Sequence, residues 1–402
     1  MVHFSGPEKI RSSNQAAILR TIRESGHISR GEIARRLQLH PSTVTRLVEQ
    51  LIAEGLVHER EDRGRSSARG GRRTIPLEFN YESSLIAGVD LSGSRIKGAL
   101  TNLAGHVLHR TDAPIAYQRS DENLARLIAL IENLLAASRP AEQYIRGIGI
   151  GAPAVTLNEE GIVTWAPSLG WRDLRLKACL EERFRLPVFV ENDVNLATLG
   201  EHWRGAAQGA GHVVGVFVGS GIGAGIIIDN ELYRGSTRAA GEVGYLIYDL
   251  ACFDESGGDF GWLESMASGP GTVRRALEAI RRGETSPVLA LAGEEGSIAP
   301  GHIFQAARQG DPLALHLAND TARYLSVAIS SVISILDPEV VVIGGGSAWA
   351  EDLLLEPIIE HVCNVVPGMP TVVPAQLGSD AVMLGAVSLV LHATDHVVLI
   401  GD

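Results

Sequence analysis

The chain has 402 residues, 45% of them hydrophobic and 20% charged, a composition that excludes disorder, while the length predicts two or three domains. Three scattered cysteines without C-x-x-C spacing exclude a disulfide framework and a cysteine-rich zinc site. The net charge of −12 conceals a basic head, because residues 1–80 carry 14 Lys and Arg against 9 Asp and Glu, and this head predicts a polyanionic partner.

The N-terminal segment lacks the apolar core of a signal peptide, so we expect no secretion. The longest apolar stretch, residues 324–336, is too short to span a bilayer, so we expect no membrane partner. The scattered cysteines fit a reducing compartment. These features together predict a protein of the cytoplasm.

Residues 14–55 predict three short helices, each with one apolar face. The second helix begins with Ser29 and Glu32, whose spacing is that of a capping box. The third begins at Pro41, which the first turn of a helix tolerates, and ends at Gly55. Helices of this kind are typical of a helix-turn-helix domain, and a plain three-helix bundle is the alternative.

The start of the third helix has a polar face that suits contact with DNA. Small polar side chains and one arginine lie there: Ser42, Thr43, Thr45 and Arg46. In a helix-turn-helix domain, side chains at this position reach base edges in the major groove. We therefore expect these four residues to contact DNA.

Residues 56–80 predict two strands around a tip that is rich in glycine and arginine. The side chains expected to point inward are Leu56, Val57, Ile75, Leu77 and Phe79. The arginines of the tip and its return are Arg63, Arg65, Arg69, Arg72 and Arg73. An arginine loop beside a recognition helix predicts a wing that enters the minor groove or binds phosphates, with a merely solvated loop as the alternative. Residues 1–80 are thus expected to form an α+β winged helix-turn-helix domain that binds double-stranded operator DNA.

The body, residues 81–402, repeats the pattern of an apolar strand that runs into a glycine-rich turn. This pattern occurs in residues 85–98, 212–228 and 338–346. The repetition predicts a duplicated α/β fold with a cleft between its halves. A further strand carries Glu191, Asn192 and Asp193 at its carboxyl end, which is the edge where α/β sheets hold ligands.

The order of these motifs resembles the ROK family of repressors, open reading frames and sugar kinases. The motifs are GVDLSGS, ENDVN, GSGIGAGIIIDNELYRGSTRAAGEVGY, WLESMASGP, VVIGGG and LGAVSLVL. The head resembles the winged helix-turn-helix of the family's xylose-type repressors, including the GGRRTIPLEFN junction. For residues 81–402 the resemblance implies a sugar-binding domain of two lobes, with the actin-like, ribonuclease-H-like ATPase fold.

The resemblance also implies a set of sugar-binding residues, which are Asn192, Asp193, Glu242, Tyr245 and Glu264. Tyr245 stands where the family has a histidine. Amide and carboxylate groups suit a sugar because vicinal hydroxyls donate and accept hydrogen bonds at once. The alternative is that residues 191–195 only cap the following helix, a role that we expect of one of them.

The family's zinc loop is altered in this chain. Relatives place three cysteines in the loop, whereas this chain has Glu255, Gly257 and Trp262 at those positions. Without thiolates to hold the ion, we expect no zinc.

The family's phosphate loops are kept only in part. The first loop resembles D-x-G-G-T in relatives, but here Ser92 adds a side chain where the backbone must approach a phosphate. The second loop, residues 219–225, and the third, residues 344–346, keep their glycines. We therefore do not expect Mg-ATP as a cofactor.

Two functions follow from these features. In the first, the chain is a regulator, expected as a repressor of carbohydrate-utilisation genes, and Asp193 accepts a hydrogen bond from a monosaccharide effector that changes operator binding. In the second, it is an ATP-dependent sugar kinase with a DNA-binding head, and Asp193 is the general base. Ser92 and the missing cysteines favour the first, so we expect no enzyme. Two-fold symmetric operators predict a homo-oligomer, either a dimer or a tetramer.

Overall fold

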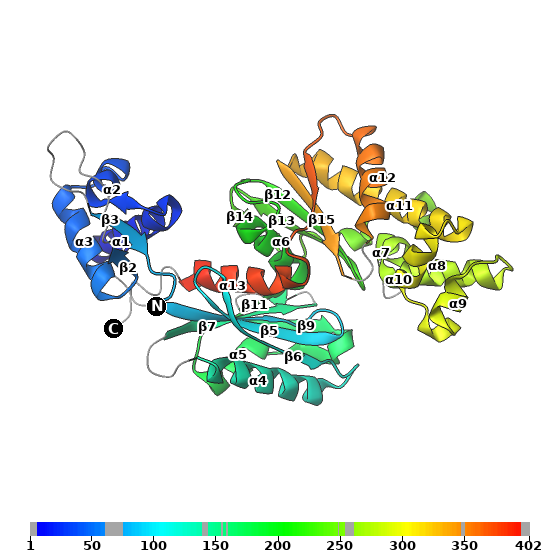
Figure 1. Cartoon of the computed structure of the whole chain (residues 1–402), viewed down its shortest axis with the longest axis horizontal. Helices are drawn as coiled ribbons and strands as arrows, with labels where there is room; N and C mark the ends of the chain where they lie inside the picture. The colour runs from blue at the N-terminus through cyan, green and yellow to red at the C-terminus, as the bar shows by residue number, and fades with distance from the viewer. Residues whose placement is uncertain are drawn as a thin grey trace.

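The chain forms an elongated molecule with a small head at one end and a two-lobed body (Figure 1). The computed structural model describes residues 6–60, 75–138, 144–153, 156–157, 160–247, 249–253, 261–346 and 350–394. None of the helices among these residues is both long enough and apolar enough to cross a membrane.

The described part of the head has three helices and an antiparallel sheet in the order β1-β3-β2. Its elements are α1 (Gly6–Ser25), β1 (Ile28–Ser29), α2 (Arg30–Arg36), α3 (Pro41–Ala53), β2 (Val57–Glu59) and β3 (Pro76–Phe79). The predicted helices and flanking strands are confirmed, although the first helix begins earlier than predicted. The capping box is also confirmed, because the Ser29 amide donates to the Glu32 carboxylate at 2.9 Å.

The head closes around one hydrophobic core to which α3 and β3 both contribute. Leu47, Leu51, Leu77 and Phe79 are buried in this core, and a buried side chain of this size stabilises a fold by roughly 1.5–3 kcal/mol. The prediction that Ile75 points inward is wrong, since its side chain is 46% exposed. The pairing of β2 with β3 ends at Leu77, so Ile75 lies beyond the strand that would cover it.

The first lobe of the body is a five-stranded sheet in the order β11-β7-β4-β5-β6. Its strands are β4 (Ser84–Asp90), β5 (Arg95–Asn102), β6 (Val107–Pro114), β7 (Tyr144–Ala152) and β11 (Val188–Asn192). Helices α4 (Ser120–Ala136) and α5 (Leu176–Phe184) cover one face (Figure 1). A small sheet beside it contains β8 (Thr156–Leu157), β9 (Ile162–Ala166) and β10 (Trp171–Leu174), with a 3-10 turn at Pro167–Leu169.

The second lobe has a sheet of the same design, in the order β14-β13-β12-β15-β16. Its strands are β12 (Val213–Val218), β13 (Ile222–Ile228), β14 (Glu231–Leu232), β15 (Val340–Gly345) and β16 (Thr371–Pro374). In both sheets the first strand pairs antiparallel with the second and parallel with the fourth. The predicted duplication is therefore confirmed, and so is the two-lobed fold class.

Helices cover the far side of the second lobe and extend it away from the head (Figure 1). They are α7 (Trp262–Ala267), α8 (Gly269–Arg281), α9 (Val288–Ala292), α10 (Pro300–Arg308), α11 (Pro312–Leu336) and α12 (Glu351–Cys363). Short 3-10 turns lie at Val243–Tyr245, Leu250–Phe253, Glu295–Ser297 and Gly378–Asp380. Residues of α11 and α12 form one core with β12 and β15.

Two helices, α6 (Asp193–Arg204) and α13 (Ala381–Thr394), lie between the two sheets (Figure 1). Glycines set their positions. A β-carbon on Gly88 would lie 2.6 Å from a carbonyl of α13, and one on Gly215 would collide with a side chain of α6. The two helices meet through Gly200 and Gly385, because a β-carbon on either would collide with the backbone of the other helix. This pair of helices therefore connects the lobes.

Candidate functional site

The first candidate site lies where β11 ends and α6 begins. Asn192 caps this helix, because its side-chain oxygen accepts hydrogen bonds from the amides of Val194 and Asn195 at 2.9 and 3.1 Å. The capping role that we expected of one residue in this cluster therefore belongs to Asn192. Asp193 follows in the first turn, where the helix dipole favours a negative charge. Its carboxylate accepts a local amide hydrogen bond, from Val194 at 2.9 Å.

Asp193 lies in a strongly acidic environment. Burial, then the charge of Asp90 and, to a smaller extent, that of Glu242, raise the pKa of Asp193 from 3.8 to about 7. Asp90 ends β4 in the first lobe, whereas Glu242 follows β14 in the second lobe. The two lobes therefore bring carboxylates close enough to affect one another's ionisation.

Glu264 on α7 completes this group of carboxylates. Burial raises the pKa of Glu264. The pKa of Glu242 is raised by burial and, to a smaller extent, by the charge of Glu264. The Ile222 amide donates to Glu264 Oε2 at 2.9 Å and fixes the side chain. Gly221 and Gly244 leave room for it, since β-carbons there would lie 2.6 and 3.1 Å from Oε2. Neighbouring carboxylates with raised pKa values are a frequent feature of functional sites.

The structure thus places Asn192, Asp193, Glu242 and Glu264 around the junction of the two lobes. Tyr245, the fifth predicted sugar contact, closes a 3-10 turn in the same segment as Glu242, and its side chain is 61% exposed. Asp90 joins this group although the sequence pattern did not lead us to predict it. Its position at the end of a strand before a glycine turn was the available signal.

A buried ion pair beside these residues was also not predicted. Glu191, which is 3% exposed, receives a hydrogen bond from Arg234 Nε at 2.6 Å. Its other oxygen accepts from the Asn192 amide at 3.0 Å and the Asn195 side chain at 3.1 Å. Glu191 is the residue before the last of β11 in the first lobe, and Arg234 follows the β13–β14 hairpin of the second, so the pair links the lobes at the site.

The first glycine turn is closed by a side chain. The amide and hydroxyl of Ser92 both donate to Asp90 Oδ1, at 2.7 and 2.5 Å. Gly93 supplies the positive φ of 75° that the turn needs. Ser92 therefore holds the turn with two hydrogen bonds to one oxygen of Asp90.

Three of the glycines retained in the other two loops are explained by packing, whereas Gly219 and Gly346 have open space beside them. A β-carbon on Gly345 would collide with the backbone of β12, and one on Gly225 would collide with Thr198 of α6. One on Gly344 would lie 2.5 Å from the Ala375 side chain. Dense packing of the second lobe requires these three glycines, so their presence does not by itself indicate a nucleotide.

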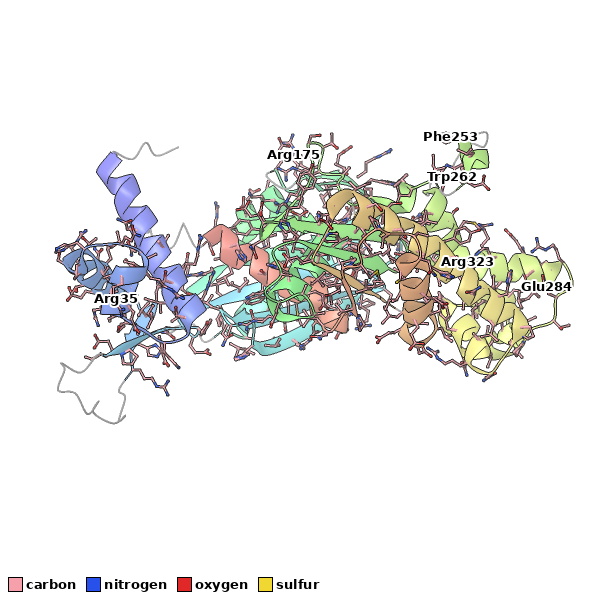
Figure 2. All side chains as sticks on the ribbon, turned by 90° about the horizontal axis from the view of Figure 1, so that it is seen from above. Arg35, Arg175, Phe253, Trp262, Glu284 and Arg323 are labelled. Carbon is pink, nitrogen blue, oxygen red and sulfur yellow. The ribbon has the colours of Figure 1, made fainter. Side chains whose placement is uncertain are left out.

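The altered zinc loop lies partly outside the described residues. Trp262 begins α7, whereas Glu255 and Gly257 fall in a segment that the structure does not describe. Figure 2 shows Phe253 and Trp262, which flank that segment, at one edge of the second lobe. Over the described ranges, no group of three or more His, Cys, Asp or Glu residues is arranged to hold a metal ion.

The second candidate site is the exposed start of α3 in the head. The side chains of Ser42, Thr45 and Arg46 are exposed, and that of Thr43 is half-buried. The five arginines predicted for the wing, Arg63, Arg65, Arg69, Arg72 and Arg73, lie outside the described residues.

His40 organises this end of α3, and we did not predict its role. Its Nδ1 atom lies 2.8 Å from the Ser42 hydroxyl and accepts from the Ser42 amide at 3.4 Å. The Thr45 hydroxyl donates to the Pro41 carbonyl at 3.0 Å. A histidine directly before Pro41 was the available signal for an unusual N-cap.

Comparison with known proteins gives two family matches. A model described as ROK family matches residues 86–393, and one described as MarR family matches residues 12–64. The two matches follow the division between body and head.

Individual relatives include repressors and a kinase. The xylose repressor of Caldicellulosiruptor bescii is 32% identical over 354 residues, which are 88% of each chain. The glucokinase of Halalkalibacterium halodurans is 34% identical over 309 residues, which are 74% of this chain and 92% of the kinase. A solved structure of a ROK family transcriptional regulator, a homolog of the E. coli MLC protein, has a TM-score of 0.82 and 27% identity, covering 97% of this chain and 98% of its own. The similarity to the regulators therefore extends over more of this chain than the similarity to the kinase.

Proposed function

This chain belongs to the ROK family, and we propose that it is a transcriptional regulator, related to xylose repressors, whose operator binding is controlled by a monosaccharide. The observation that carries the proposal is that one chain joins a helix-turn-helix head, with an exposed polar recognition face, to a body that gathers carboxylates from both lobes. It acts in the cytoplasm, where operator DNA is found.

The head, residues 1–80, supplies the DNA contacts. Ser42, Thr43, Thr45 and Arg46 read base edges from the start of α3. The wing arginines Arg63, Arg65, Arg69, Arg72 and Arg73 contact phosphates or the minor groove. The protein binds its operator as a dimer or tetramer, so that two heads meet two half-sites.

The body, residues 81–402, binds the effector. Asn192, Asp193, Glu242, Tyr245 and Glu264 form the set that contacts the sugar hydroxyls. Since named relatives are xylose repressors, D-xylose is the first sugar to test. Asp193 accepts a hydrogen bond from a hydroxyl, and binding favours one relative position of the two lobes.

Regulation without catalysis is supported by the phosphate side of the body. Ser92 folds onto Asp90, and the glycines at Gly225, Gly344 and Gly345 are required by packing. Contacts within the chain explain both features without bound ATP. The effector therefore acts by binding and is not phosphorylated.

One observation favours a second function, that of a sugar kinase. A pKa of about 7 for Asp193 is the value at which a carboxylate serves well as a general base near neutral pH. The experiment that separates the two functions measures operator affinity with D-xylose, with and without Mg-ATP, alongside a search for sugar phosphate. A sugar response without ATP and without product supports the regulator, and sugar-dependent ATP turnover supports the kinase.

A further inference from the structure

Helix α6 runs from the proposed effector residues to the junction between body and head. We infer that it transmits the effector signal to the recognition helix α3, with Trp203 as the contact that couples them. The inference rests on the proposed function, because it takes Asn192 and Asp193 at the start of α6 as effector contacts.

The far end of α6 makes direct contact with the body-to-head junction. Trp203 packs against two hydrophobic clusters. One joins the head to β4, the β5–β6 turn and α13, and the other is a small cluster with Met383 and Leu384 of α13. The indole of Trp203 also rests on the turn between β5 and β6. A β-carbon on Gly105 in that turn, where φ is 79°, would lie 2.8 Å from the edge of the ring. The turn therefore follows the position of Trp203 closely.

The same turn is tied to the connector between head and body, residues 80–83, which lies between β3 and β4. The Asn102 side chain accepts hydrogen bonds from the amides of Ala104 and His106, at 3.0 and 2.9 Å, and so gives the turn its shape. Its amide group donates to the Glu82 carboxylate at 2.5 Å. The Leu103 amide donates to the Tyr81 carbonyl at 3.0 Å. A displacement of the turn therefore displaces the connector.

The connector in turn holds the end of the recognition helix. The Asn80 side chain donates to the Gly55 carbonyl at 2.8 Å, and the Asn80 amide donates to the Leu56 carbonyl at 2.9 Å. Both acceptors follow α3 within three residues of its last residue, Ala53. Hydrogen bonds and packed side chains thus connect Asp193 to α3 without interruption.

The start and the end of α6 move together because the helix is locked to α13. Glu201 is fully buried in α6 and accepts three backbone hydrogen bonds, from the amides of Ala206, Gln376 and Leu377, at 2.8, 3.1 and 2.8 Å. The last two residues lead into α13. Rigid elements of this kind transmit a small displacement over their whole length.

The described residues show no such connection between the second lobe and the head. Within the described part of the chain, the hydrophobic cluster of the head continues into β4, the β5–β6 turn and α13, and it contains no residue of β12 to β16. When an effector draws Glu242 and Glu264 towards Asp193, the displacement reaches the head through α6 and α13. Coupling between distant sites is demonstrated only when a variant changes the coupling and leaves both sites intact.

The test uses the full-length chain and the variant Trp203→Ala. D-xylose binding is measured by calorimetry, and operator binding by fluorescence anisotropy, with a duplex that the wild-type protein has selected from a random pool. We expect both affinities of the variant to stay within about threefold of wild type, and the effect of D-xylose on operator affinity to fall at least about tenfold. Trp165→Ala is the control, because it removes an exposed tryptophan of β9 that is not among the contacts between Asp193 and α3. Its response to D-xylose should equal that of wild type.

Two further variants keep the inference falsifiable if Trp203→Ala folds poorly. Trp203→Leu keeps an apolar side chain, and Glu82→Ala removes an exposed acceptor from the connector, so both should fold and both should lose the response. A full response to the sugar in the folded variants would overturn the inference and leave the proposed function standing. A wild-type protein whose operator affinity is unaffected by any sugar would overturn both.

Discussion

The two lobes of the body share one strand order, yet they differ in what they are attached to. The first lobe carries Asp90 and Asp193 and continues into the head through β4 and α13. The second lobe carries Glu242 and Glu264, and its helices extend away from the head (Figure 1). The same fold is therefore joined to the head in one half and extends away from the head in the other.

This difference indicates how a duplicated sugar-binding fold can serve a DNA-binding head. In the proposed mechanism a ligand held by both lobes changes their relative position. Among the described residues, the hydrophobic cluster of the head extends into the first lobe and the α6–α13 pair but into no strand of the second sheet. The head is therefore expected to respond to the proposed ligand through the elements that both lobes share. Variants in each lobe and in the head should therefore have separable effects.

The largest effect is expected where the lobes are linked by a buried ion pair. Arg234→Met leaves the Glu191 carboxylate buried without its cation, and removal of one partner of such a pair costs about 3–5 kcal/mol. Urea unfolding of the full chain measures this loss. The double variant Glu191→Gln with Arg234→Met should recover much of the stability. A loss below about 1 kcal/mol in the single variant would show that the lobes do not depend on this pair.

Asp193→Ala removes the proposed acceptor of a sugar hydroxyl. Hydrogen bonds to charged groups contribute about 1.5–3 kcal/mol, so D-xylose affinity should fall about 10- to 100-fold while sugar-free operator binding is unchanged. Calorimetry on wild type and variant measures the difference. Asp229→Ala is the matched control, because Asp229 is 87% exposed on the second lobe. Equal sugar affinity in wild type and Asp193→Ala would remove Asp193 from the site.

Arg46→Ala tests the head independently of both lobes. Loss of an arginine that contacts a base edge should weaken operator binding by about 1–3 kcal/mol and relax specificity at one position. The sugar affinity of the body should not change. Arg175→Ala, which lies on the body in Figure 2, controls for the loss of one positive charge. Equal operator affinity in both variants would argue against α3 as the recognition helix.

The smallest effect is a dependence of stability on pH. The folded-state pKa of Asp193, about 7, lies above its ordinary value of 3.8, so the folded chain holds a proton that the unfolded chain has released. Stability should therefore fall as pH rises from about 5 to 7 and level off above 7. Calorimetric melting of wild type and of Asp193→Asn at several pH values measures this loss. Between pH 5 and 7 the variant should lose less stability than wild type, by on the order of 1 kcal/mol. Parallel curves for the two proteins would contradict the raised pKa.

Much of the fold could be predicted from the sequence because its signals are local. The capping box at Ser29, Pro41 at the start of α3 and the apolar strands before glycine turns all correspond to observed elements. Ile75 is the exception in the head, since period-two alternation does not show where strand pairing stops.

The site could be predicted only in part, because its defining interactions join distant segments. The cluster at Glu191 to Asp193 was visible as a strand end, but Arg234, the half-buried partner of Glu191, lies 43 residues away from it and belongs to the other lobe. The role of Trp203 depends on a turn about a hundred residues earlier in the chain. Such contacts follow from the tertiary arrangement and leave no local pattern.

One titration tests whether a sugar alone controls operator binding. D-xylose is added to the full-length chain on its operator in the absence of ATP, for wild type and for Asp193→Asn. We predict that the sugar changes the operator affinity of wild type and that the variant responds only at much higher sugar concentration. A wild-type response that requires Mg-ATP, or that is accompanied by sugar phosphate, would contradict regulation by binding alone.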